Sequence, residues 1–126
     1  MIAEEQVKIK RNYTFSITNE ADYRASNITL INKGISFDLK TPDNFFTNVY
    51  VKIIGMHNLK NVLSALSVID QIKEIEIKEL LPFLSSLKGI ERRMEIYTIN
   101  DKIIIDDYAH HPTEIVSVYD LSLIHI

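Results

Sequence analysis

The stretch from Asp106 to Glu114, DDYAHHPTE, gathers several chemically active side chains into nine residues. It holds two adjacent aspartates, a tyrosine, two adjacent histidines and a glutamate, and it follows the apolar run KIII. Carboxylates and imidazoles can ligate metals, transfer protons, or bond to the hydroxyls of a nucleotide. A metal site, an acid–base pair, a nucleotide contact and an ordinary polar turn are therefore all open interpretations.

Strand geometry weakens two of these interpretations. Adjacent residues of a strand point to opposite faces, so Asp106 and Asp107 are not expected to act as a pair. The same holds for His110 and His111 if the chain is extended there, and we therefore predict no metal site. A carboxylate at the C-terminal end of an apolar strand, by contrast, lies where open α/β sheets bind ligands.

A second cluster, GMHNLKN, places His57, Asn58 and Asn61 where a strand passes into a helix. Asn58 and Asn61 are three residues apart and so share one helix face. An asparagine amide offers an acceptor and two donors, which suits the edge of adenine. The alternative is that Asn58 caps the helix and Asn61 is solvated.

A third cluster, ERR, contains Arg92 and Arg93. One arginine that points into a cleft can meet a phosphate or a ribose edge, because its guanidinium presents a planar set of donors. The alternative is a solvated run of surface charge.

The elements that must position these clusters can be read from the apolar pattern. Strands are expected at 13–18, 27–32, 34–39 and 46–54, with residues 19–24 as a polar connection. The sequence Asn32-Lys33-Gly34 predicts a hairpin turn in which the glycine supplies a positive φ.

Helical spacing begins after Gly55. The apolar residues of 57–72 lie on one helical face, and a second helix is expected over 76–88, with a start or kink at Pro82. A strand, a polar turn and a strand follow, and Pro112 then stands in the first turn of a last helix.

Composition narrows the class of protein. The 126 residues suffice for one modest domain or for parts of two, and the net charge of −3 predicts no nucleic-acid partner. The sequence has no cysteine, which excludes disulfides and thiolate metal sites and fits a cytoplasmic protein. No apolar run reaches the roughly 20 residues of a membrane span, and no phosphate-binding G-x-x-x-x-G-K-[ST] loop is present.

The order of the three clusters resembles the Mur ligase family: G-x-H-N-x-x-N opening a helix, then R-R, then D-D-Y-A-H-H-P-T-E after a strand. The similarity covers nearly the whole chain and includes YTFSITNEADYRASNI. Ser64 and Ser67 stand where the family commonly has alanine, and the last few residues do not match the family. The resemblance implies an α/β fold. Residues 1–88 would be the end of a central ATPase domain, with strands followed by helices, and the P-loop of that domain would lie upstream. Residues 89–126 would be the start of a Rossmann-like C-terminal domain.

The resemblance also implies a reaction. It joins L-alanine to UDP-N-acetylmuramate through an acyl phosphate at the expense of ATP, in peptidoglycan precursor synthesis, with Mg²⁺ ligands mostly outside this chain. Two alternatives stay open. One is the attachment of a recycled murein tripeptide to the same sugar nucleotide, and the other is a non-catalytic nucleotide-binding module. The sequence does not indicate an oligomeric state.

Residue roles carry over by motif. Those implied for the nucleotide are His57, Asn58 and Asn61 at the adenine, Arg92 or Arg93 from the C-terminal part, and Asp106 or Asp107 at the ribose. Tyr108 and His110 are implied for the incoming amino acid, and His111, Pro112 and Thr113 for capping the following helix.

Overall fold

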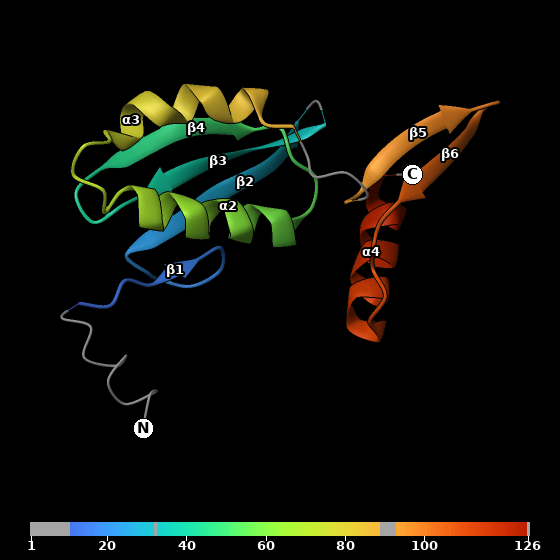
Figure 1. Ribbon diagram of the computed structural model, residues 1–126, viewed down its shortest axis with the longest axis horizontal. Helices are drawn as coiled ribbons and strands as arrows, with labels where there is room; N and C mark the ends of the chain where they lie inside the picture. Colours follow the sequence, from blue (N-terminus) through green and yellow to red (C-terminus); the bar gives the residue numbers. More distant parts are fainter. Residues whose placement is uncertain (1–10, 32, 89–92, 126) are drawn as a thin grey trace.

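The computed structural model describes residues 11–31, 33–88 and 93–125, and it shows a mixed α/β fold, as predicted (Figure 1). The elements are, in chain order, β1 (Phe15–Ser16), β2 (Tyr23–Ile31), β3 (Gly34–Lys40), β4 (Phe45–Val51), α2 (Met56–Ile69), α3 (Ile77–Leu80), the 3₁₀ helix η1 (Leu81–Ser86), β5 (Glu95–Ile99), β6 (Lys102–Asp106) and α4 (Pro112–His125).

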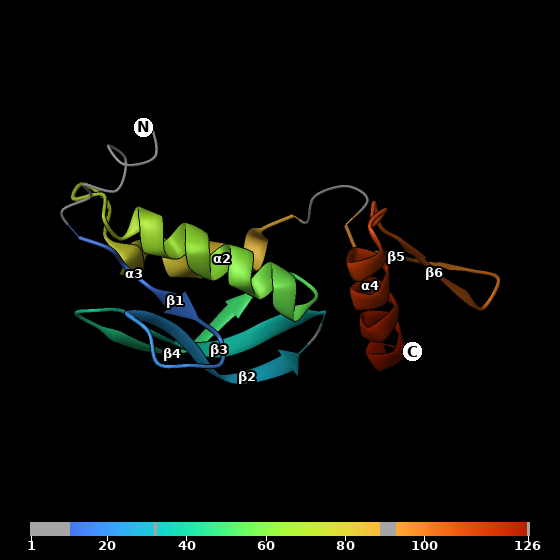
Figure 2. The same ribbon diagram turned by 90° about the horizontal axis from the view of Figure 1, so that it is seen from below.

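The first four strands form one sheet in the order β1-β2-β3-β4. The β2–β3 and β3–β4 pairs are antiparallel, whereas β1 is parallel to β2 and pairs only with Tyr23 and Arg24. Helices α2 and α3 lie on the same face of this sheet (Figure 2). The core therefore forms between that face and the helices.

Helix α2 contributes Leu59, Leu63 and Leu66 to the core, each no more than 1% exposed. Their spacing of four and three residues places them on one face, which packs on the sheet side chains Tyr23, Ala25, Ile35, Phe37, Leu39, Val49 and Val51. The predicted helix is confirmed, although it ends at Ile69 rather than Ile72.

The predicted polar connection at 19–24 was wrong for its last two residues. Strand β2 begins at Tyr23, whose side chain is fully buried. Its hydroxyl donates to Asp70 Oδ2 at 2.8 Å and accepts a hydrogen bond from Gln71 Nε2. The ring is thus a core residue with a polar tip, a role hidden by its polar neighbours in the sequence.

The prediction for the β2–β3 turn was also wrong in one respect. Lys33 has a φ of 60°, whereas Gly34 is not in the positive-φ region, and Asn32 lies outside the described residues. A Cβ atom at Gly34 would overlap the ring of Tyr50 on β4. A larger residue at this position would therefore have to displace the Tyr50 side chain.

Pro82 has the predicted effect on the second helical segment. The α-helical hydrogen bonds stop at Leu80, and the 3₁₀ helix η1 continues with the proline in its first turn. Proline has no N–H and its ring clashes with the preceding turn, so a regular α-helix cannot pass through it. The predicted strands at 13–18 and 46–54 are present but shorter than expected.

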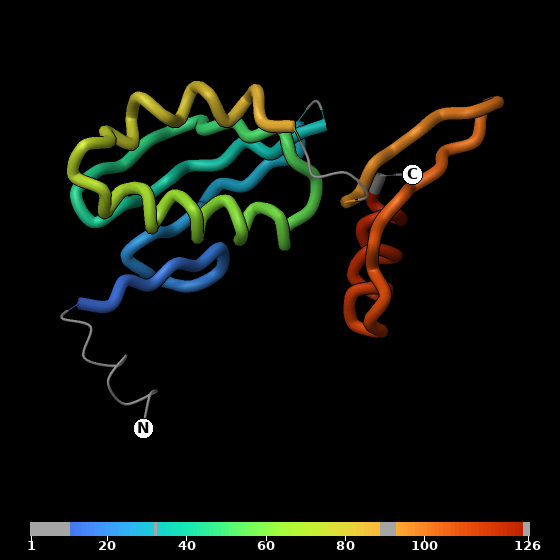
Figure 3. Tube along the Cα trace, in the orientation of Figure 1, coloured from blue at the N-terminus to red at the C-terminus, as the bar shows by residue number. Residues whose placement is uncertain are grey.

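The last three elements form a β-hairpin followed by a helix (Figure 3). Asn100 and Asp101, with φ values of 49° and 62°, make the tight turn between β5 and β6. Met94 is the only buried hydrophobic residue between 93 and 124, and the hairpin's isoleucines are largely exposed. These elements therefore have little core of their own.

Candidate functional site

The first cluster of the site lies at the N-terminal end of α2, the end that faces the β5–β6–α4 unit (Figure 1). Gly55 is the N-cap residue, with φ 94° and ψ 139°, so the alternative that Asn58 caps this helix was wrong. Asn58 is instead half-buried, and its Nδ2 donates to the carbonyl of Ile54 at 2.7 Å. His57 and Asn61 are exposed. The helix therefore presents an imidazole and an amide to solvent, beside an amide that fixes the preceding loop.

The carboxylate of Asp107 binds two backbone groups. Its Oδ2 accepts the N–H of Met94 at 2.9 Å, and its Oδ1 accepts the N–H of Ala109 at 2.7 Å. Asp106 is the last residue of β6, in register with Glu95 on β5. The two aspartates thus belong to different local structures.

Tyr108 and His110 lie together on the exposed loop after β6. Their ring centroids are 5.1 Å apart with an interplanar angle of 62°, and His110 Nδ1 lies 3.1 Å from the carbonyl oxygen of Tyr108. His111 does not share this arrangement, because its Nδ1 accepts the N–H of Thr113 at 3.4 Å. The loop therefore offers one phenol and one imidazole side by side, with the second imidazole used to cap α4.

Glu114 completes the cap of α4. Its Oε2 accepts the N–H groups of His110 and His111, each at 3.3 Å, and lies 3.7 Å from His110 Nδ1. These hydrogen bonds, the one from His110 first, lower the pKa of Glu114, and the positive charge of Arg93 adds to the effect. The role was missed from the sequence, although a glutamate three residues after the helix cap is the signature of a capping box.

Of the two arginines, only Arg93 lies within the described residues, and Arg92 lies outside them. Arg93 is exposed, and its charge reaches Glu114 at the start of α4. Arg93 is thus close enough to the start of α4 for its charge to act on Glu114.

A metal ion has no evident ligand set in the part of the chain that the structure describes, since no group of three histidine, aspartate or glutamate side chains converges there. The exposed groups at α2, by contrast, have the mixed donor and acceptor chemistry that a purine edge requires.

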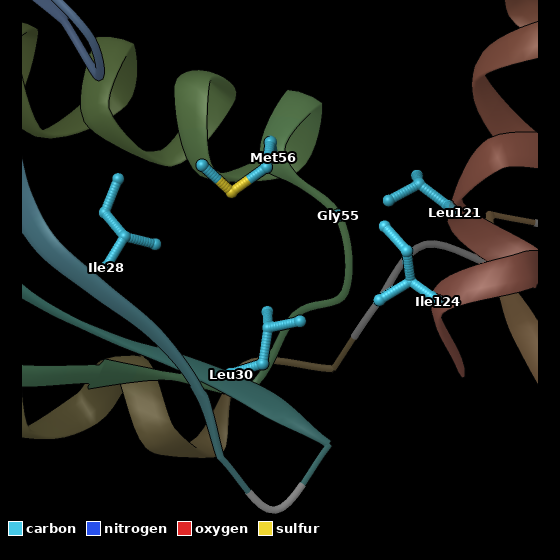
Figure 4. Close-up of a pocket in the computed structure, with 6 residues that line it drawn as sticks. All are labelled: Ile28, Leu30, Gly55, Met56, Leu121 and Ile124. Atoms are coloured by element: carbon cyan, nitrogen blue, oxygen red, sulfur yellow. The ribbon is translucent and has the colours of Figure 1, made fainter. Parts of the chain in front are cut away.

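A cavity of about 170 Å³ lies between the start of α2, strand β2 and helix α4 (Figure 4). Its lining is apolar and consists of Ile28, Leu30, Gly55, Met56, Leu121 and Ile124. A nucleotide needs polar groups to fix its orientation, and this cavity supplies no polar side chain. Among the described residues, no helix combines the length and apolar character needed to cross a bilayer.

Solved structures of other proteins have a similar fold. The chain shares its fold with the MurC structure from Thermotoga maritima, with a TM-score of 0.73 at 22% identity over 95% of this chain and 28% of that one. MurF from Acinetobacter baumannii gives a TM-score of 0.76 at 22% identity, covering 88% of this chain and 24% of that one. These likenesses show the fold, which is mixed α/β.

Sequence similarity identifies the family. Residues 1–69 match the model described as the Mur ligase middle domain. The UDP-N-acetylmuramate–L-alanine ligase of Ligilactobacillus salivarius is 39% identical over 106 residues, which are 84% of this chain and 24% of that protein. The chain belongs to the Mur ligase family and spans about a quarter of the length of the curated relatives it matches.

Proposed function

We propose that this chain is part of a UDP-N-acetylmuramate–L-alanine ligase, which acts in the cytoplasm in peptidoglycan precursor synthesis. The observation that carries the proposal is the match to ligases of this name, including 39% identity over 84% of the chain and 40% over 85%. The likeness to other Mur ligases at lower identity supports the fold alone.

The proposal assigns residues 1–88 to the end of the central, ATP-binding domain and 89–126 to the start of the C-terminal domain. Support comes from the core, which joins the first sheet to helices ending at Ser86, while the hairpin that begins at Glu95 contributes nothing to that core. The site would then form where the start of α2 faces the hairpin and α4.

On the nucleotide side, His57, Asn58 and Asn61 would lie at the adenine. Asn58 Nδ2 already donates to a backbone carbonyl, so Asn58 would set the shape of the pocket. Its second N–H and its amide oxygen would be the groups that bind the adenine. Arg93, or Arg92 beside it, would reach the nucleotide from the C-terminal part.

On the acceptor side, Tyr108 and His110 would place the amine of L-alanine. Their rings are adjacent and both side chains are exposed, so a small ligand can reach them. An imidazole can accept a proton from the ammonium group, but orientation of the amine is the role that the geometry supports best.

The reaction has two steps in this proposal. The lactyl carboxylate of the sugar nucleotide takes the γ-phosphoryl group of ATP and releases ADP, and the amine of L-alanine then displaces phosphate to form the amide. When bound, Mg²⁺ neutralises the charge on the phosphoryl oxygens. Its ligands and the phosphate-binding loop would come mainly from other parts of the complete enzyme.

The test is phosphate release by the intact ligase that contains this chain, with UDP-N-acetylmuramate and ATP present. We expect release to depend on L-alanine. Dependence on the murein tripeptide with no response to L-alanine would favour the recycling ligase, and ATP binding without any turnover would favour a binding module. Asn58→Ala should raise the KM for ATP, and His110→Ala should raise the KM for L-alanine more than that for ATP.

A further inference from the structure

The imidazole of His110 is held at one of its two nitrogens. Its Nδ1 lies 3.1 Å from the carbonyl oxygen of Tyr108 and 3.7 Å from Oε2 of Glu114. A carbonyl oxygen and an ionised carboxylate have no proton to donate, so both contacts are favourable only when Nδ1 carries a proton. A neutral imidazole has a single N–H, and a proton on Nδ1 therefore leaves the lone pair on Nε2.

The orientation of this ring is set from two further directions. The ring of Tyr108 stands against it at an interplanar angle of 62°, and this edge contact limits rotation of the imidazole. Glu114 also holds the main chain beneath the ring, because its Oε2 accepts the N–H of His110 at 3.3 Å. The side chain of His110 is nevertheless 72% exposed, so a small ligand can reach it from solution.

His111 has the opposite hydrogen-bonding pattern. Its Nδ1 accepts the N–H of Thr113 at 3.4 Å, so the lone pair is on Nδ1 and the proton of the neutral ring is on Nε2. The two adjacent histidines therefore present different groups at Nε2, an acceptor in His110 and a donor in His111. An ammonium group has donors but no acceptor. Of this pair, His110 is thus the one whose Nε2 matches the ammonium group of an amino acid.

We propose that Glu114 is a positioning residue that holds His110 as the Nδ1–H tautomer, so that Nε2 of His110 accepts a hydrogen bond from the ammonium group of L-alanine. Glu114 acts through its charge beside Nδ1 and through its hydrogen bonds to the main-chain N–H groups of His110 and His111. The inference rests on the proposed function, since it takes His110 as a contact of the incoming amino acid.

Long-range ¹H–¹⁵N NMR of the intact ligase, labelled with ¹⁵N-histidine, reads the tautomer directly. The spectra separate the Nδ1–H, Nε2–H and doubly protonated rings, and they are recorded at a pH high enough that the doubly protonated pattern is absent. The signals of His110 are assigned by their loss in His110→Gln. In the wild type we expect the Nδ1–H form for His110 and the Nε2–H form for His111, which serves as an internal control.

Glu114→Gln removes the charge of Glu114 but keeps an acceptor oxygen for the main-chain N–H groups. In this variant the spectrum of His110 should move toward the Nε2–H form, and its KM for L-alanine should rise about fivefold, the effect of one weakened hydrogen bond. The KM for ATP should rise less. Glu79→Gln is the control, because Glu79 is likewise exposed in the first turn of a helix, α3, and this variant should match the wild type. An Nε2–H ring at His110 in the wild type, or an unchanged tautomer in Glu114→Gln, would overturn the proposal.

Two substitutions of His110 identify the ring nitrogen that meets the ligand. The side-chain amide of glutamine can reach the position of Nε2, whereas that of asparagine reaches only the position of Nδ1. The KM for L-alanine should therefore be lower in His110→Gln than in His110→Asn, and the reverse order would overturn the proposal. If phosphate release by the wild type does not depend on L-alanine while the spectra are as expected, the proposed function is refuted and the tautomer assignment alone remains.

Discussion

Gly55→Ala offers a direct test of how the start of α2 is held. Gly55 has φ 94° and ψ 139°, a region that is essentially restricted to glycine. Alanine would have to adopt it, at a cost of about 1–3 kcal/mol, or shift the first turn of the helix. A Cβ atom would also lie 3.0 Å from Leu121 Cδ1, but that methyl group ends a flexible side chain and can rotate away. The cost of the backbone conformation therefore decides how much Gly55→Ala destabilises the protein.

Urea unfolding followed by far-ultraviolet circular dichroism measures this effect. With a destabilisation of about 2 kcal/mol and a slope of about 2 kcal/mol/M, the midpoint should fall by about 1 M. Lys60→Ala, exposed on the same helix, should change stability by no more than about 0.5 kcal/mol. Asparagine tolerates left-handed helical angles but not a ψ near 139°, so Gly55→Asn should be no better than alanine. An unchanged midpoint for Gly55→Ala, or recovery with asparagine, would refute the strain argument.

Three further predictions concern the core and the cap. Leu63→Ala removes a side chain with no exposed surface and should cost about 2–5 kcal/mol in urea unfolding, against less than about 0.5 kcal/mol for Val68→Ala, whose side chain is 64% exposed. Burial, and then the hydrogen bond to Asp70, raise the pKa of Tyr23 above its ordinary 10.0. The stability that this provides is complete below pH 10 and is lost as the pH rises further. The unfolding free energy of Tyr23→Phe should therefore fall less steeply at alkaline pH than that of the wild type. An equally steep fall in both proteins would contradict this prediction. The lowered pKa of Glu114 gives the opposite pH dependence. Its contribution to stability is present above pH 4.5 and is lost as the pH falls through the lowered value. The amide shifts of His111 should therefore titrate in acid in the wild type and stay constant in Glu114→Gln; the same acid titration in both proteins would remove Glu114 from the cap.

The sequence predicted those features that depend on neighbours along the chain. The helical face of Leu59, Leu63 and Leu66 follows from spacing alone, and the effect of Pro82 follows from its missing N–H. The capping role of Glu114 was available from the same local reasoning. Local chemistry is enough in these cases because each interaction spans one turn of helix or less.

Features that depend on distant parts of the chain escaped prediction. The hydroxyl of Tyr23 donates to Asp70 at the far end of α2, and the separation of 47 positions along the chain conceals this contact. Asp107 likewise meets Met94 only after the hairpin has formed. The alternation of side chains along a strand predicted that Asp106 and Asp107 would not act as a pair, but it could not assign a partner to either. The roles of His57, Asn61 and His110 in ligand binding stay predictions.

The short pairing of β1 has a consequence for handling the isolated chain. β1 covers only Tyr23 and Arg24, so no described strand lies beside the outer edge of the rest of β2, where Leu30 and Ile31 are 48% and 44% exposed. An apolar edge with open backbone groups is a template for strands from other molecules. At high concentration the 126-residue chain should therefore self-associate through this edge, and a lysine in place of Leu30 should keep it monomeric.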